Sequence, residues 1–152
     1  MSPMAWKERM PAVEHLTPDP DLHLLLEDGA LIRPARWQGH HALFMLPEVP
    51  PRLWILSRLN SGFSRFEDRG VLIGDLTFYD EFGAHRLTTH LTSCPAEGWG
   101  PQQSPLTRWT SGKALLEFDC PPSSTAVMMS MEICSEGPYR LWPHEEPQSP
   151  VT

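Results

Sequence analysis

Seventeen prolines among 152 residues constrain this chain more than any other feature of its sequence. A proline fixes its own φ angle and has no amide hydrogen to donate, so it is excluded from helix interiors and from central strands. The prolines are spread along the whole chain without a collagen-like period. We therefore expect many short elements that are joined by loops of defined conformation.

Short apolar or alternating runs lie between the prolines, and glycine-containing turns separate them. Asp28-Gly29 predicts a type I′ hairpin, in which both central residues have positive φ. Gln38-Gly39 and Ser111-Gly112 predict further short turns, and Gly74 predicts a β-bulge. No run keeps the period of an amphipathic helix. The pattern predicts an all-β domain of about nine or ten short strands, folded as an antiparallel two-sheet sandwich with the jelly roll as one variant.

Side-chain alternation predicts which residues face the core. Within residues 71–80, Ile73 and Tyr79 fall on one face of a strand, whereas Leu76 and Phe78 fall on the other. Trp54 stands between two aliphatic residues, and its size and its neighbours assign it to the core.

The distribution of proline and polar residues predicts the domain boundaries. Residues 1–20 are expected to form a flexible lead-in, residues 21–142 a single β-sandwich domain, and residues 143–152 a disordered tail. The N-terminus lacks the apolar segment of a signal peptide, and no run approaches the roughly 20 apolar residues of a membrane span. A cytoplasmic protein without a membrane span is therefore expected.

The formal charge of −7, from 19 acidic and 12 basic residues, argues against nucleic acid as a partner. Binding to phosphates needs clustered Lys and Arg side chains, and this chain has few lysines. The three cysteines show no CxxC spacing, which makes a disulfide framework or a zinc site poorly supported. One disulfide between two of them stays open as an alternative; they are Cys94, Cys120 and Cys134.

The sequence contains none of the common catalytic or nucleotide-binding motifs, such as GxSxG, HExxH, a P-loop or GxGxxG. No cofactor, no catalytic residue and no metal are expected. A cupin-like metal site is the alternative, and its ligands would be His41, His85 and His90. Residues five apart on a strand face opposite sides, which speaks against pairing the last two. The alternative acids for glycoside hydrolysis would be Glu67, Asp68 and Asp75.

Tryptophan and arginine side chains form the most suggestive set of binding residues. An indole ring stacks on the apolar C–H face of a sugar, and guanidinium or amide groups bond the sugar hydroxyls. The same residue types also pack cores and tie loops to carbonyl groups, so a structural role stays open. The predicted ligand-binding residues are Trp99, Arg69, Arg108, Trp109, Gln103 and Arg58.

Two groups of motifs carry a resemblance. The segments "EGWGPQQ" and "RWTSGKALLEF" resemble β-rich accessory domains of bacterial proteins associated with polysaccharides and glycosyltransferases. The segments "TPDPDLHLLLEDG", "RLWILSR" and "DRGVLIG" resemble the C-terminal extension of Hint-domain proteins in acetic-acid bacteria and related alphaproteobacteria. The resemblance implies a β-sandwich linked to surface polysaccharide.

The chain departs from the resembled pattern at two places. Gln102-Gln103 and Ser111 stand where the pattern has acidic residues or Asp/Asn, which weakens any role of those acids in binding. No Hint domain with its histidine block is visible, so self-processing is not expected.

The sequence thus favours a non-enzymatic β-sandwich module that binds a glycan or a protein partner, with a homodimer as a further expectation. A small cupin-like or β-barrel enzyme that acts on a sugar or a small polar metabolite is the first alternative. A structural or assembly subunit, with methionines of the "VMMSM" run at an interface, is the second. The stretch from Thr107 to Phe118 is interpreted as mainly structural, with Ser111-Gly112 as a turn that the Thr110 hydroxyl braces.

Overall fold

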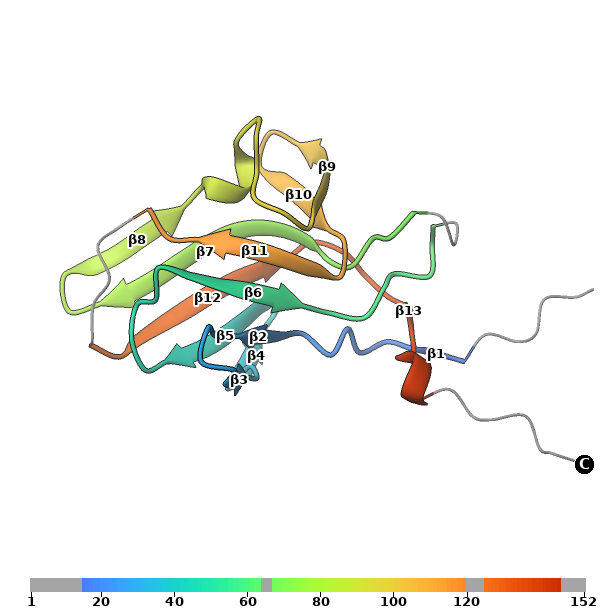
Figure 1. The fold of residues 1–152 in the computed structure, drawn as a ribbon, viewed down its shortest axis with the longest axis horizontal. Helices are drawn as coiled ribbons and strands as arrows, with labels where there is room; N and C mark the ends of the chain where they lie inside the picture. The colour runs from blue at the N-terminus through green and yellow to red at the C-terminus, as the bar shows by residue number, and fades with distance from the viewer. Residues whose placement is uncertain (1–14, 64–66, 120–124, 146–152) are drawn as a thin grey trace, which may run out of the picture.

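The computed structural model describes residues 15–63, 67–119 and 125–145 and shows an all-β, sandwich-like fold (Figure 1). These residues form thirteen strands and two short 3₁₀ helices, which turns and loops connect. Every strand pair among them is antiparallel. The predicted all-β sandwich is confirmed, but the described residues form thirteen strands where about nine or ten were predicted, because several strands are only two or three residues long. Within the same ranges, no helix has the length and the hydrophobicity to cross a membrane.

The larger sheet has seven strands in the order β4-β5-β12-β7-β10-β9, and β8 pairs with β7 beside β10. Its strands are β4 (Arg36–Gln38), β5 (His41–Leu46), β7 (Leu72–Asp80), β8 (Gly83–Leu87), β9 (Trp99–Ser104), β10 (Thr107–Thr110) and β12 (Val127–Ile133). The smaller sheet has four strands in the order β11-β6-β2-β3. Its strands are β2 (His23–Leu25), β3 (Leu31–Ile32), β6 (Arg52–Leu56) and β11 (Lys113–Glu117).

Two segments outside the predicted domain limits belong to the described fold. The strand β1 (Leu16–Thr17) pairs with β13 (Tyr139–Arg140), and the helix η2 (Pro143–Glu145) follows it. The other short helix, η1 (Thr89–Leu91), follows β8.

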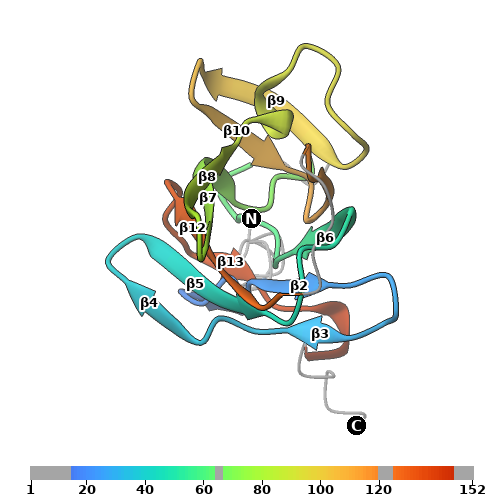
Figure 2. The same cartoon turned by 90° about the vertical axis from the view of Figure 1, so that its left-hand side faces the viewer.

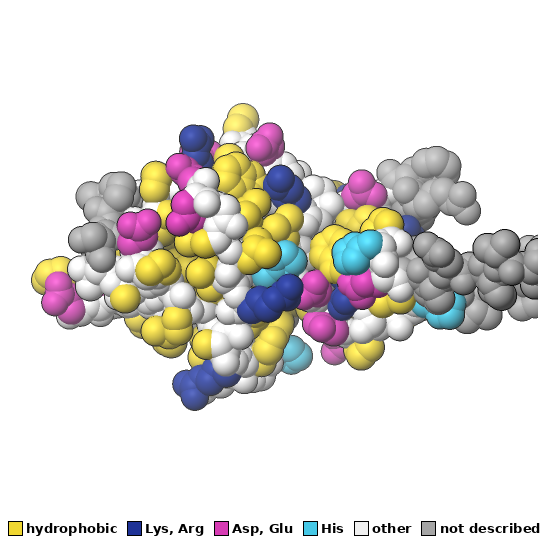
Figure 3. All heavy atoms as spheres, turned by 60° about the horizontal axis from the view of Figure 1, so that its bottom comes forward, with side chains coloured by type: hydrophobic (Ala, Val, Ile, Leu, Met, Phe, Trp, Pro, Cys, Tyr) yellow, Lys and Arg dark blue, Asp and Glu magenta, His cyan; other side chains and the backbone are white. Residues whose placement is uncertain are grey.

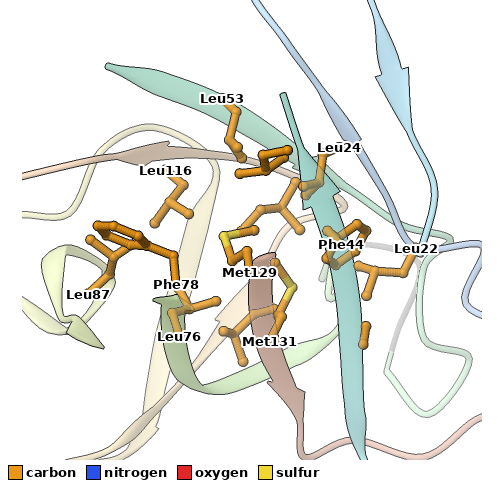
Figure 4. Close-up of a cluster of buried hydrophobic side chains, with 14 of the residues drawn as sticks. Leu22, Leu24, Phe44, Leu53, Leu76, Phe78, Leu87, Leu116, Met129 and Met131 are labelled. Atoms are coloured by element: carbon orange, nitrogen blue, oxygen red, sulfur yellow. The ribbon is translucent and has the colours of Figure 1, made fainter. Parts of the chain in front are cut away.

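The two sheets lie face to face, with the smaller one toward the viewer in Figure 1 and on the right in Figure 2. Their facing sides form one core, in which aliphatic, aromatic and methionine side chains interdigitate (Figure 4). Met129 and Met131 of β12 are fully buried there, where their flexible side chains fill the space between the sheets, whereas Met128 is only half-buried. The labelled members of this core are Leu22, Leu24, Phe44, Leu53, Leu76, Phe78, Leu87, Leu116, Met129 and Met131.

The assignment of Trp54 to the core is wrong. Its neighbours Leu53 and Ile55 are both 0% exposed and point inward, and alternation along β6 therefore turns Trp54 outward. The indole lies half-buried on the outer side of the smaller sheet. Apolar neighbours on both sides of a tryptophan thus mark a strand, but they do not say which face the tryptophan occupies.

The β-bulge predicted at Gly74 is confirmed. Met131 pairs with Leu76 and Ile133 pairs with Ile73, so that two residues of β7 oppose one residue of β12. Because of this extra residue, Ile73 and Leu76 both reach the core, and the prediction that Ile73 shares a face with Tyr79 is wrong. The Gly74 carbonyl accepts a hydrogen bond of 2.9 Å from Nε2 of the buried His90.

The predicted turns are present, with two differences in detail. β2 and β3 form the hairpin expected at Asp28-Gly29, but only Gly29 has positive φ, so the turn is not type I′. Ser111-Gly112 does connect two strands, yet β10 and β11 belong to different sheets, and the turn carries the chain across the sandwich. Gly112 has a φ of 100°, and its amide donates to the Thr110 hydroxyl at 3.3 Å. The proposed bracing by Thr110 is therefore confirmed.

His90 should make the stability of the fold depend on pH. Burial lowers the pKa of His90 below its ordinary value of 6.5, and the nearby charges of Arg108 and Arg86 add to this effect. The unfolded chain then takes up a proton below about pH 6.5 that the folded chain excludes, so stability is retained above that pH and falls as the pH falls. His90→Gln can keep a donor for the Gly74 carbonyl but cannot titrate. We expect the free energy of unfolding, measured with urea between about pH 7.5 and 5.5, to change less with pH in this variant than in the wild type. The same dependence on pH in both proteins would contradict the account.

Candidate functional site

The structure places Trp99 and Arg108, two of the predicted ligand-binding residues, in a structural junction. The Trp99 indole donates to the carbonyl of Leu115 at 2.8 Å, and its ring lies 5.4 Å from the ring of His90. Arg108 donates to three backbone carbonyls, those of Gly100, His90 and Thr92, at 2.8, 3.1 and 2.7 Å. Trp99 thus ties β9 to β11, Arg108 ties β10 to β9 and η1, and both keep little bonding capacity for a ligand.

A second group of predicted residues gathers around Phe63. The Trp109 ring meets Phe63 edge-on at 5.1 Å between centroids, and the guanidinium of Arg69 lies 5.3 Å from the centre of the same ring. The Trp109 indole donates to the side-chain carbonyl of Gln103 at 3.2 Å. Trp109 is only 8% exposed, so this group packs one end of the larger sheet.

Arg58 lies apart from both groups. It donates to both carboxylate oxygens of Glu145 at 2.9 and 2.7 Å, and to the Asp19 carbonyl at 2.9 Å. Its role is to tie the first and last described segments to the end of β6. The six predicted residues therefore divide into separate structural groups and do not converge on one open surface.

The histidines of the alternative metal site occupy different surroundings. His41 lies on the outer side of β5, His85 stacks on Phe78 at 4.8 Å and bonds Asp80, and His90 is buried. No group of three or more potential ligands is present within residues 15–63, 67–119 and 125–145.

The alternative acids and the cysteines are likewise not assembled into a site. Glu67 pairs with Arg69 at 3.3 Å, and Asp75 faces Arg86 at 3.7 Å. Cys94 and Cys134 are free and exposed, whereas Cys120 lies outside the described residues. Partial burial raises the pKa of the Cys134 thiol, and the charge and hydrogen bond of Glu132 raise it further, which favours the protonated thiol.

An open surface does exist on the outer side of the larger sheet, which we call the Tyr79 face. Ala42, Phe44 and Leu46 of β5 point into the core, so the residues between them point outward. The ladder register then aligns outward side chains in rows across the strands. One row is Met45, Met128, Tyr79 and Ala84; the next is Arg36, Leu43, Ser130, Thr77 and Arg86; the third is Gln38, His41 and Glu132.

A shallow cavity of about 310 Å³ lies on this face, lined by Gln38, His41, Leu43, Tyr79, Met128 and Ser130. Four strands line it, because β4, β5, β12 and β7 are neighbours in this order. The Tyr79 ring is 42% exposed, while Leu43 beneath the surface is 5% exposed. The cavity thus has an apolar floor and an accessible aromatic wall.

Polar side chains with unused bonding capacity surround that floor. Gln38, His41 and Ser130 make no side-chain hydrogen bond or ion pair with any other described residue. Ser130 as a residue is 9% exposed, and its hydroxyl oxygen, which has no hydrogen-bond partner among the described residues, is still open to solvent. A ligand that bonds these groups can therefore replace water there without the loss of a hydrogen bond to the protein.

The charged groups on the Tyr79 face are partly neutralised by one another. Asp75 accepts from the Thr77 hydroxyl at 2.8 Å and faces Arg86, and the Glu132 carboxylate accepts from the Asp75 amide at 3.1 Å. Arg36 lies on β4 at the border of the cavity, exposed and without a described partner. No carboxylate lines the cavity itself. This arrangement suits an uncharged or weakly anionic polar ligand.

Sequence reasoning missed the Tyr79 face, although part of the signal was present. The alternation within residues 71–80 already put Tyr79 opposite Leu76 and Phe78. The missing information was the pairing of β12 with both β5 and β7, which brings Gln38, His41 and Ser130 to the same ring.

Comparisons with family models, with curated proteins and with solved structures found no match to this chain. The resemblance to extensions of Hint-domain proteins, the cytoplasmic location and the homodimer therefore stay predictions.

The structural role of Arg108 predicts a large effect on stability. Arg108→Leu removes a charged donor from three carbonyls and should cost about 2 to 3 kcal/mol in the free energy of unfolding. Arg36→Leu is the matched control, because the Arg36 side chain is exposed and has no described partner; its cost should stay within about 0.5 kcal/mol. Urea unfolding measures both, and equal stability of the two variants would show that Arg108 does not hold this junction.

Proposed function

We propose that the protein is a non-enzymatic saccharide-binding module and that the Tyr79 face is its binding surface. The observation that supports this most is the group of three unpartnered polar side chains, Gln38, His41 and Ser130, beside one exposed aromatic ring. A sugar ring offers an apolar C–H face for the Tyr79 ring and hydroxyls that both donate and accept hydrogen bonds. The amide of Gln38, the imidazole of His41 and the hydroxyl of Ser130 can each donate a hydrogen bond to a sugar hydroxyl or accept one from it.

The size and shape of the cavity also favour a small ring ligand. Its volume of about 310 Å³ is near the lower end of the range for small-molecule sites. It opens onto a broad sheet face, so a saccharide chain can continue beyond the residue that occupies the cavity. This openness suits recognition of a polymer, and it agrees with the polysaccharide link that the sequence resemblance implies.

The cavity lacks the features of a catalytic centre. Ser130 and His41 both line it, but no hydrogen bond joins them, so the hydroxyl has no base to activate it. A hydrolytic pair of carboxylates would have to lie within the cavity, and none of its lining residues is acidic. Binding without chemical conversion is therefore the function that these side chains support best.

Titration with oligosaccharides tests the proposal. Isothermal calorimetry with a panel of neutral, N-acetylated and uronic-acid hexasaccharides should find at least one ligand. Tyr79→Ala should weaken its binding about tenfold or more, a loss of about 1.4 kcal/mol that matches one lost ring contact. Gln38→Ala and Ser130→Ala should each weaken it as well, because each removes one hydrogen-bond partner.

Phe82→Ala is the matched control for these variants. Phe82 lies in the turn between β7 and β8, is 83% exposed and does not line the cavity, so its removal should leave the affinity unchanged. Absence of binding throughout the panel, or an equal loss for the Phe82 and Tyr79 variants, would contradict the proposal.

A further inference from the structure

The smaller sheet also has an open outer side, which we call the Trp54 face. The register of β11, β6, β2 and β3 aligns one apolar row across it, formed by Leu115, Trp54, Leu25 and Leu31. Leu31 at the end of this row is 55% exposed. The smaller sheet lies toward the viewer in Figure 1, and the view that brings the lower side forward shows hydrophobic side chains interspersed with charges of both signs (Figure 3).

A cavity of about 300 Å³ lies beside the indole, lined by Trp54, Glu97, Gly98 and Lys113. The Lys113 ammonium group is 5.9 Å from the centre of the Trp54 ring. Apart from this contact, the side chains of Lys113 and Glu97 make no hydrogen bond or ion pair with other described residues. The cavity therefore contains an outward-facing indole together with one donor and one acceptor that have no hydrogen-bond partner among the described residues.

The wall of this cavity is held in place by the backbone. The Leu115 amide donates to the Glu97 carbonyl at 2.9 Å, and the Ser111 amide donates to the Gly98 carbonyl at 2.8 Å. Gly98 has a φ of 86°, and a Cβ atom there would overlap the carbonyl oxygen of Lys113. Only glycine fits this approach, and the two hydrogen bonds fix the position of Glu97 relative to β11. The site is thus built before any ligand arrives.

We propose that the Trp54 cavity is a second saccharide-binding site, so that one molecule links two saccharide chains. This inference rests on the proposed function of the Tyr79 face. A saccharide fits better than a protein surface, because the indole offers apolar area for a C–H face of a sugar, while Lys113 and Glu97, which line the same cavity, can bond sugar hydroxyls. Two stacked sheets lie about 10 Å apart and their outer sides point in opposite directions. The two sites therefore hold separate chains, and the protein cross-links a polysaccharide.

Fluorine NMR of protein labelled with 5-fluorotryptophan tests the second site directly. The Trp54 signal is assigned from its loss in Trp54→Phe, and the same hexasaccharide panel is titrated into wild type and Tyr79→Ala. We expect a panel member to shift the Trp54 signal in both proteins, while the signal of Trp99, whose indole is bonded to Leu115, stays unchanged. Lys113→Met should weaken this shift without altering binding at the Tyr79 face.

The outcomes separate the two proposals. Binding that Tyr79→Ala abolishes, without any shift of the Trp54 signal, overturns the second site and leaves the proposed function standing. Absence of all binding overturns both.

Cross-linking is tested by a separate measurement. Wild type should make a solution of the matching long polysaccharide turbid, whereas Tyr79→Ala and Trp54→Ala should each leave it clear. Persistent turbidity with either variant would contradict the link between the two sites.

Discussion

The register of β12 between β5 and β7 is the constraint on which the rest of the structure depends. Met129 and Met131 enter the core only in this register, and it turns Met128 and Ser130 toward the Tyr79 face. A slip by one residue would exchange the two sets, bury a hydroxyl and expose two methionines. The core therefore selects the register, and the register assembles the cavity from β4, β5, β7 and β12.

The bulge at Gly74 divides β7 into two parts with different tasks. On one side of it, Ile73 fills the core and the strand pairs with β10. On the other side, Leu76 and Phe78 fill the core while Thr77 and Tyr79 face outward. His90 caps the bulge through the Gly74 carbonyl, and Arg108 holds η1 through the His90 carbonyl. Trp99, whose ring lies beside His90, and Arg108 are thus explained by the need to cover this irregular point.

Local sequence signals were sufficient for the fold class and for several turns. Prolines and alternating runs predicted the all-β sandwich, Gly74 predicted the bulge, and Ser111-Gly112 predicted a turn. The faces of Trp54 and Ile73 could not be predicted in this way. The face of Trp54 depends on how β6 is oriented in its sheet. The face of Ile73 depends on the shift in register that the bulge introduces.

The candidate site was beyond reach from the sequence, because its parts are brought together only by long-range pairing. Gln38, Tyr79 and Ser130 come from three distant segments, and none of them belongs to a recognisable motif. Trp99 and Arg108 stood out in the sequence because large side chains can form many contacts. A structural junction needs such side chains as much as a binding site does.

A crystal structure of the protein with a bound oligosaccharide tests the central claim most directly. The account predicts a sugar ring against the Tyr79 ring, with hydroxyls bonded to the side chains of Gln38, His41 and Ser130. A sugar bound only around Trp99, Arg69 and Arg108, with the Tyr79 cavity left to solvent, would contradict it.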